Sequence, residues 1–188
     1  MLSDTDIVNA ALQQIGDNAP VVTGNAPNFD SSPAGIAAAQ LYTNCVRTVA
    51  RQFGWDFSRN IAALVLSGNP APVGYSFEYL YPTSGIQVRQ LLPAAIADLN
   101  DPLPINWTVG NALVAGVPKK VIWTRLANAE ASFTNQPPPD LWDAGFVEAV
   151  VRTLGSEFAS ALAGRPDTMR DLLTTGQQFE KLAEVRSD

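Results

Sequence analysis

The hydrophobic pattern of this 188-residue chain changes its period twice, and this change constrains the fold more than any other feature. Up to Phe53, apolar residues recur every three to four positions, as they do on one face of a helix. Between Ile61 and Thr124 they alternate with polar residues, and turn residues follow at short intervals. After the prolines at 137–139 the helical spacing returns. We therefore expect an α+β fold, in which a four-helix unit of two N-terminal and two C-terminal helices carries a small inserted antiparallel β-sheet.

The length of the chain is typical of one domain, or of one domain that carries a large insertion. We expect a single domain over residues 1–188, with a helical pair and a long loop at 1–57, the inserted β-sheet at 58–127 and a second helical pair at 138–188. Two helical pairs that are separated in sequence can share one bundle core, because the insert needs only to begin and end near the same point.

Local signals predict where several elements begin, turn or face the core. Ser3 and Asp6 have the spacing of a capping box for the first helix, and Asp140 is expected to cap the third. Gly110-Asn111 is expected to be the turn of a hairpin, and Lys119-Lys120 to lie in a solvated turn. An alternating aromatic row predicts a strand with one face in the core, with stacking on bases or sugar rings as the alternative: Tyr75, Phe77, Tyr79 and Tyr81.

Several classes of catalytic site are excluded by what the sequence lacks. The chain has no histidine, which excludes Ser-His and Cys-His catalysis and histidine metal sites. It has neither of the glycine-rich motifs that bind nucleotide phosphates. With a net charge of −6 and one pair of adjacent basic residues, tight nucleic-acid binding is not expected. No apolar run approaches the roughly 20 residues of a membrane span. We expect no catalytic residue, no cofactor, no metal and no membrane contact.

A carboxylate pair is the catalytic arrangement that the sequence leaves open. Asp140, Asp143 and Glu148 stand near the start of the third expected helix, and two of them could act as the paired acids of a glycosidase. Acidic residues in the first turn of a helix are also favoured by its dipole. We prefer this structural interpretation of the three residues.

Residues 17–33 are rich in Asn, Pro, Gly, Ser and Asp and lack periodicity, which predicts a long loop. A segment of this length without a core of its own seldom stays fixed alone. We expect the loop to become ordered against a neighbouring subunit, with Asn25 and Phe29 at the partner interface. A mobile surface loop is the alternative.

Several segments, in order along the chain, resemble one protein family. Residues 6–16 are similar to its short first helix, which ends in Gly, and residues 47–57 to its exit from the second helix, an arginine followed by Trp-x-Phe. Residues 75–82 resemble its aromatic strand, which ends in Pro, although members often continue with Asp-Cys where this chain has Thr83-Ser84. The last strand and long third helix are matched by residues 121–124, 141–146 and 154–159. The family is that of tail tubular protein A and the related head-to-tail adaptors of short-tailed bacteriophages.

The resemblance implies a structural virion protein of the tail or neck, assembled in the host cytoplasm, and not an enzyme. Subunits of the family form a ring, commonly dodecameric, that connects the phage portal to the tail nozzle and forms part of the DNA conduit. The expected partners are therefore further copies of the chain, the portal protein and the tail nozzle protein. Double-stranded DNA is expected to pass through without specific binding, which the negative net charge of the chain fits.

A last helix is expected from Pro166 to about Val185, with a narrow apolar stripe. C-terminal segments of the adaptor family tend to reach the portal. We therefore expect portal contacts through Leu172, Leu173, Phe179 and Leu182. Two other functions stay open: a virion-associated polysaccharide-degrading enzyme, and a head-completion or stopper protein of a long-tailed phage.

Overall fold

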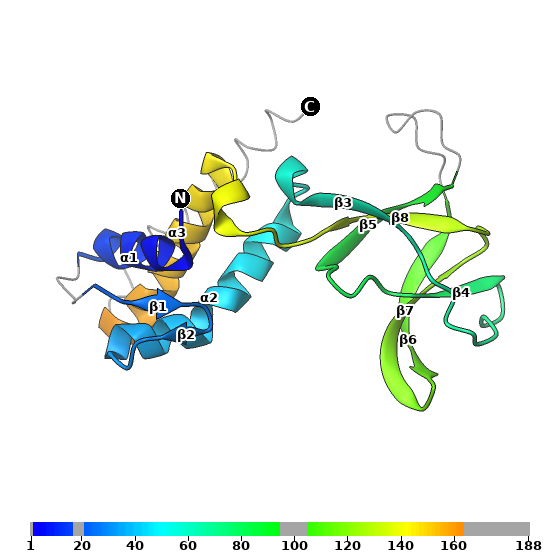
Figure 1. Ribbon diagram of the computed structural model, residues 1–188, viewed down its shortest axis with the longest axis horizontal. Coiled ribbons are helices and arrows are strands. Elements are labelled where there is room, and N and C mark those ends of the chain that lie inside the picture. Colours follow the sequence, from blue (N-terminus) through cyan, green and yellow to red (C-terminus); the bar gives the residue numbers. More distant parts are fainter. Residues whose placement is uncertain (1, 17–20, 95–104, 164–188) are drawn as a thin grey trace. The chain divides into compact units, whose positions relative to one another are not determined.

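The computed structural model describes residues 2–16, 21–94 and 105–163 (Figure 1). The chain divides into two compact units. The helical unit comprises Met1–Ser58 and Gln136–Asp188, and the β unit comprises Arg59–Asn135. The last strand of the β unit runs to Thr134, beyond the end at residue 127 that the alternating pattern indicated for the inserted sheet.

The expected four-helix unit with one inserted sheet is wrong. The described residues form three α-helices and eight strands in three sheets, an α+β mixture of another composition. The expected fourth helix, residues 166–185, lies outside the described part of the chain. The number of sheets differed because alternation identifies a strand, but the partner of that strand is chosen by contacts far away in sequence.

Three helices bury one another's apolar faces in the helical unit: α1 (Asp4–Gln14), α2 (Pro33–Gln52) and α3 (Ala144–Phe158). Both α1 and α2 pack against α3, which continues into the π-helical segment η3 (Ala159–Ala163). The large side chains of this core are buried: Ile7, Val8, Leu12, Tyr42, Val46, Val49, Phe146, Val150, Leu154 and Phe158. Burial of each such side chain contributes about 1.5–3 kcal/mol, so packing rather than helix propensity holds the unit together.

The capping box of α1 is confirmed. Ser3 Oγ accepts a hydrogen bond from the Asp6 N–H at 3.2 Å, and Asp6 Oδ2 accepts one from the Ser3 N–H at 2.9 Å. In α2 the Ser32 hydroxyl accepts from the Gly35 N–H at 3.0 Å, and Pro33 occupies the first helical position, where its missing N–H costs nothing. Both helices therefore begin where the local sequence places them.

The start of α3 differs from the prediction. Asp140, expected as its cap, lies in the short 3-10 helix η2 (Pro139–Leu141), and Asp143 holds the N-cap position without a side-chain capping bond. Trp142, between these acids, is buried, donates from Nε1 to the Pro137 carbonyl at 2.8 Å and packs edge-on against Phe146. This anchored indole decides where the chain enters α3, which no capping signal encodes.

Polar side chains of α1 hold the described part of the long loop. Its short strands β1 (Gly24–Asn25) and β2 (Asn28–Phe29) pair as a hairpin. The Asn9 amide bonds both backbone groups of buried Val22, at 2.9 and 3.1 Å. Asp4 accepts from the Tyr42 hydroxyl at 2.7 Å and from the Ala26 N–H at 3.3 Å. The loop thus has contacts within its own chain that the sequence did not indicate.

Two antiparallel three-stranded sheets make up the β unit. One has the order β3 (Arg59–Ala63), β8 (Ala129–Thr134), β5 (Gln87–Pro93), and the other β4 (Phe77–Leu80), β7 (Val117–Thr124), β6 (Trp107–Val114). Both sheets contribute to one core: Tyr79, Val88, Leu91, Ile122, Ala129, Ala131 and Phe133. The core position predicted for the aromatic row is confirmed for Tyr79, and Phe77 and Tyr81 pack at the edge of this core.

Candidate functional site

Strands β6 and β7 form a hairpin that is longer than the strand beside it. They pair over eight residues each, whereas β4 pairs only with the last part of β7, Val121–Thr124. Residues 111–120, the hairpin arm, therefore extend past β4 as a two-stranded ribbon (Figure 1). The chain turns at Ala115-Gly116, where φ is 52° and 77°. Two consecutive positive φ values are typical of a type I′ turn, whose twist matches that of the paired strands.

The turn predicted at Gly110-Asn111 is wrong, because both residues lie inside β6. Gly110 serves a different purpose there. The Trp123 indole lies across it, and a Cβ at this position would overlap the ring. A glycine within a strand often marks such a close approach, and in the sequence it cannot be told from a turn residue.

A buried carboxylate fastens the base of the arm. Glu78 on β4 is 3% exposed, and Trp123 Nε1 donates to its Oε2 at 2.7 Å. The Ser67 hydroxyl and the Asn69 amide donate to its Oε1 at 2.7 and 3.0 Å. Asn69 Nδ2 also donates to the Leu113 carbonyl at 3.0 Å, so the network reaches into the arm. Each bond to the carboxylate is charge-assisted and stronger than a bond between neutral groups.

The electrostatics of Glu78 follow from these contacts. Burial raises the pKa of the carboxyl group, but the hydrogen bonds from Trp123, Ser67 and Asn69 outweigh it and hold the pKa below its ordinary value. Glu78 is therefore ionised at neutral pH. With donors on both oxygens, the carboxylate acts as a structural anchor, which the sequence did not reveal; the one signal was a glutamate alone in an aromatic strand.

The register of the hairpin assigns its exposed side chains to two faces. Leu113 lies opposite Pro118, Asn111 opposite Lys120 and Val109 opposite Ile122. One face of the hairpin therefore carries Val109, Asn111, Leu113, Pro118 and Lys120, and we name it the hairpin face. Leu113 is 65% exposed and Val109 38%. The Lys120 ammonium lies 3.8 Å from the centre of the Tyr81 ring. The hairpin face thus combines uncovered apolar area with a cation held in place by an aromatic ring.

The solvated turn predicted at Lys119-Lys120 is also wrong. Both lysines are exposed, but they lie within strand β7. Successive side chains of a strand point to opposite faces, so Lys119 lies on the face away from Lys120, together with Val117. Two residues that look equivalent in the sequence therefore serve different surfaces.

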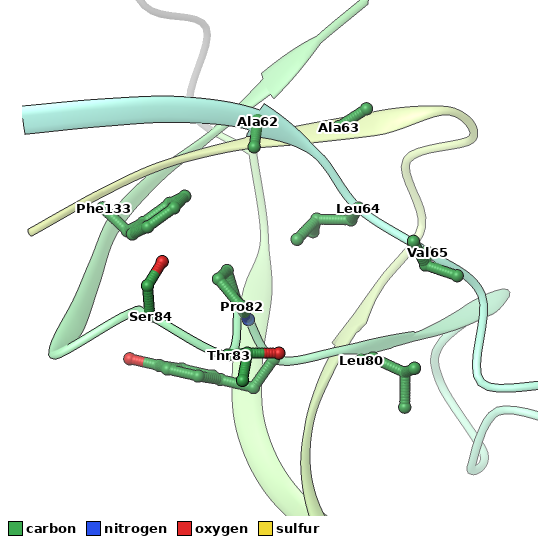
Figure 2. Close-up of a pocket in the computed structure, with 10 residues that line it drawn as sticks. Ala62, Ala63, Leu64, Val65, Leu80, Pro82, Thr83, Ser84 and Phe133 are labelled. Atoms are coloured by element: carbon green, nitrogen blue, oxygen red, sulfur yellow. The ribbon is translucent and has the colours of Figure 1, made fainter. Parts of the chain in front are cut away.

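The β unit also contains an apolar pocket of about 540 Å³ (Figure 2). Its wall comes from the ends of β3 and β4, the residues that follow each of these strands, and one residue of β8: Ala62, Ala63, Leu64, Val65, Leu80, Tyr81, Pro82, Thr83, Ser84 and Phe133. Of the described residues that line it, none is charged. The pocket offers apolar contact and a few hydroxyl groups, and its lining supplies no carboxylate or amine for acid-base chemistry.

The residues predicted to contact a partner lie in two places. Asn25 is exposed on β1, and Phe29 on β2 is half-buried, with its ring edge-on to Tyr42 at 5.9 Å. Phe29 therefore packs within its own chain on one side. The other four, Leu172, Leu173, Phe179 and Leu182, lie outside the described residues.

The three acidic residues of the glycosidase alternative occupy different surroundings. Asp140 and Asp143 are exposed, whereas Glu148 forms an ion pair with Arg152 at 2.6 Å. At about 100° per residue, Glu148 projects from a different side of α3 than Asp143. The described residues contain no group of three or more His, Cys, Asp or Glu side chains placed to hold a metal ion.

No protein-family model and no curated protein sequence matches the chain. Among the described helices, none is both long and apolar enough to span a membrane. The surface most suited to a function is therefore identified by geometry: the hairpin face, held by the Glu78 network.

Proposed function

We propose that the chain is a structural virion protein, an adaptor subunit whose copies form a ring between the portal and the tail nozzle of a short-tailed bacteriophage. The observation that carries the proposal is the hairpin face, where Val109 and Leu113 stay exposed on an arm anchored through Glu78. Burial of such apolar area against a partner is favourable, and the anchored arm loses little conformational freedom on binding.

The resemblance to the adaptor family supports the proposal independently. Its segments correspond to α1, the end of α2, β4, the end of β7 and parts of α3. These elements supply core residues of both units, among them Ile7, Tyr79 and Leu154. The similarity thus concerns residues on which the folding of both units depends, and not only exposed loops.

In this proposal the ring, commonly dodecameric in the family, surrounds double-stranded DNA as it leaves the head. The DNA passes without specific binding, because a subunit with a net charge of −6 repels phosphates. The portal and the nozzle protein are the partners above and below. The subunit assembles in the host cytoplasm and stays in the neck of the virion, without a catalytic role.

Electron microscopy of the purified full-length protein, mixed with the portal of the same phage, tests the proposal. We expect an added ring layer on one face of the portal. Portal particles without added density, at protein concentrations well above those of the portal, would overturn it. Binding only to a portal that already carries another adaptor layer would assign the protein as a stopper instead.

The same preparation, incubated with host capsular and cell-wall polysaccharides, tests the enzyme alternative. The proposal expects no release of reducing ends. Cleavage that is lost in the double variant Asp140→Asn with Asp143→Asn, while the fold is retained, would replace the structural function with a catalytic one.

A further inference from the structure

The two units differ in charge. The β unit has five basic and four acidic residues and a net charge of +1, whereas the helical unit has seven basic and fourteen acidic residues and a net charge of −7. Two copies each carry a net charge of −6, but an orientation that places the β unit of one against the helical unit of the next brings fewer like charges together than one that places two helical units together. The contact must then lie where both units have exposed side chains that suit each other.

Four carboxylates of the helical unit are used inside the chain. Asp6 completes the capping box of α1, Asp4 binds Tyr42, Asp30 accepts from the Thr23 N–H, and Glu148 pairs with Arg152. These acids are therefore poor anchors for a partner, because a partner would compete with bonds already formed.

Asp140 and Asp143 are different. Both are exposed, and Asp143 holds a helix N-cap position without using its side chain for the cap. Leu141, between them, is 61% exposed, because the buried neighbour Trp142 turns inward against Phe146. We name Asp140, Leu141 and Asp143 the acidic patch: an apolar side chain flanked by two carboxylates.

The acidic patch is complementary to the hairpin face. There, Leu113 and Val109 are exposed beside the Lys120 cation. We propose that the hairpin face of one copy binds the acidic patch of a second copy, with Leu113 against Leu141 and Lys120 facing Asp140 and Asp143. The two surfaces are different, so the contact is head-to-tail and repeats from copy to copy, and a ring closes if the rotation fits. This inference specifies how neighbouring subunits of the proposed ring contact each other, and the role of that ring rests on the proposed function.

Disulfide trapping between two differently marked chains tests the contact directly. A tagged full-length Leu113→Cys chain is mixed with an untagged Leu141→Cys chain under mild oxidation, with the native Cys45 buried and out of reach. We expect a tagged–untagged disulfide dimer. The matched control is Val73→Cys, fully exposed in the same unit, which should give at least about fivefold less dimer with the same partner. Equal yields from Leu113→Cys and Val73→Cys overturn the inference.

Charge reversal separates the proposed contact from a folding defect. Lys120→Glu and Asp143→Lys should each lower the trapped yield about tenfold, since each places like charges against each other. Chains that carry both charge reversals should recover most of the trapped dimer yield. Lys119→Glu, on the other face of the arm, should have little effect. Failure of the double reversal to rescue, with all variants folded by circular dichroism, contradicts the pairing.

The outcomes also separate this inference from the proposed function. A ring layer on the portal without Leu113–Leu141 trapping leaves the adaptor function standing and refutes the interface. Trapping without a portal layer supports the interface and refutes the adaptor function. The arm could instead contact DNA. In that case the wild-type protein binds double-stranded DNA, Lys120→Glu abolishes this binding, and no disulfide dimer is trapped; this result would refute the inference.

Discussion

The helical unit and the β unit hold their charged side chains in different ways. In the helical unit, acids near the surface close the ends of secondary structure, as Asp6 does for α1 and Asp30 for the turn before α2. In the β unit, the single carboxylate of β4, Glu78, is buried and joins a strand, a loop and the hairpin arm. The contacts of Asp6 and Asp30 are set by residues nearby in the sequence, whereas those of Glu78 depend on the pairing of strands that are distant in the sequence. The helical unit should therefore tolerate loss of an acid better than the β unit does.

The largest loss of stability is expected from a substitution in the core of the helical unit. Such a substitution tests whether side-chain packing stabilises this unit. Phe146 is 2% exposed and its ring lies within about 5 Å of three others, Trp55, Phe57 and Trp142. Phe146→Ala should lower the free energy of unfolding by about 3–5 kcal/mol, because it leaves a cavity among aromatic rings. Urea denaturation followed by circular dichroism measures this. Leu141→Ala, at an exposed position nearby, should change it by less than about 0.5 kcal/mol.

The second largest effect is expected from Glu78, whose loss should affect the β unit and not the helical unit. Glu78→Ala should destabilise the β unit by about 2–3 kcal/mol, since Trp123, Ser67 and Asn69 lose their common acceptor. Hydrogen exchange should rise in residues 107–124 and stay unchanged in α1 and α2. Asn111→Ala, exposed on the same hairpin, is the control. An equal rise in both units would show that they do not respond independently.

The stability of the β unit should fall when the pH is lowered. The pKa of Glu78 is lower in the folded chain than its ordinary value, so its stabilising contribution is complete above the ordinary value of 4.5 and is lost as the pH falls below it. In acid, the wild-type protein should therefore approach the exchange pattern of Glu78→Ala in residues 107–124.

A smaller effect is expected where α1 holds the loop. Asn9→Ala removes both bonds to buried Val22 and should cost about 1–2 kcal/mol in local stability. Faster amide exchange in residues 21–32, with no change in the β unit, is the expected result. Asn28→Ala, exposed on β2, should leave the exchange as it is. If Asn9→Ala also has no effect, the loop is held by other contacts.

The smallest effect is expected from Asp30, a half-buried acid in the turn before α2. Hydrogen bonds from Ser32 and Thr23 lower its pKa from 3.8 to about 2. Its contribution is therefore complete above pH 3.8 and is lost as the pH falls towards about 2. The Thr23 amide resonance, followed by NMR, should shift in that window. In Asp30→Asn this shift should be absent, and a midpoint near the ordinary value would show that the bonds do not form in solution.

The sequence predicted the features that depend on near neighbours. The capping box of Ser3 and Asp6 needs only contacts within one helical turn, and it was placed correctly. Tyr79 was assigned to the core from alternation alone. These features are readable because the energy that decides them is local.

Contacts between distant residues were not predictable in the same way. Gly110 was interpreted as a turn because the Trp123 ring that needs its space comes thirteen positions later, on the next strand. Asp140 was interpreted as a helix cap because the anchoring of Trp142 by the Pro137 carbonyl leaves no periodic signal. The same limit applies to the candidate site. Its two faces follow from the register of β6 on β7, which is fixed only when Ala115-Gly116 forms the turn.

The two-residue turn at Ala115-Gly116 also restricts how the reach of the arm can evolve. Inserting one residue into one strand would flip every side chain beyond it and exchange the two faces. Inserting one residue into each strand keeps the strands paired and moves the tip outward, but every side chain beyond the insertions then points to the opposite face. Only the addition of two residues to each strand keeps every side chain on its original face. Each such step lengthens the arm by roughly 7 Å. In the head-to-tail contact proposed above, an arm that had to bridge a wider gap should therefore be longer by such paired steps.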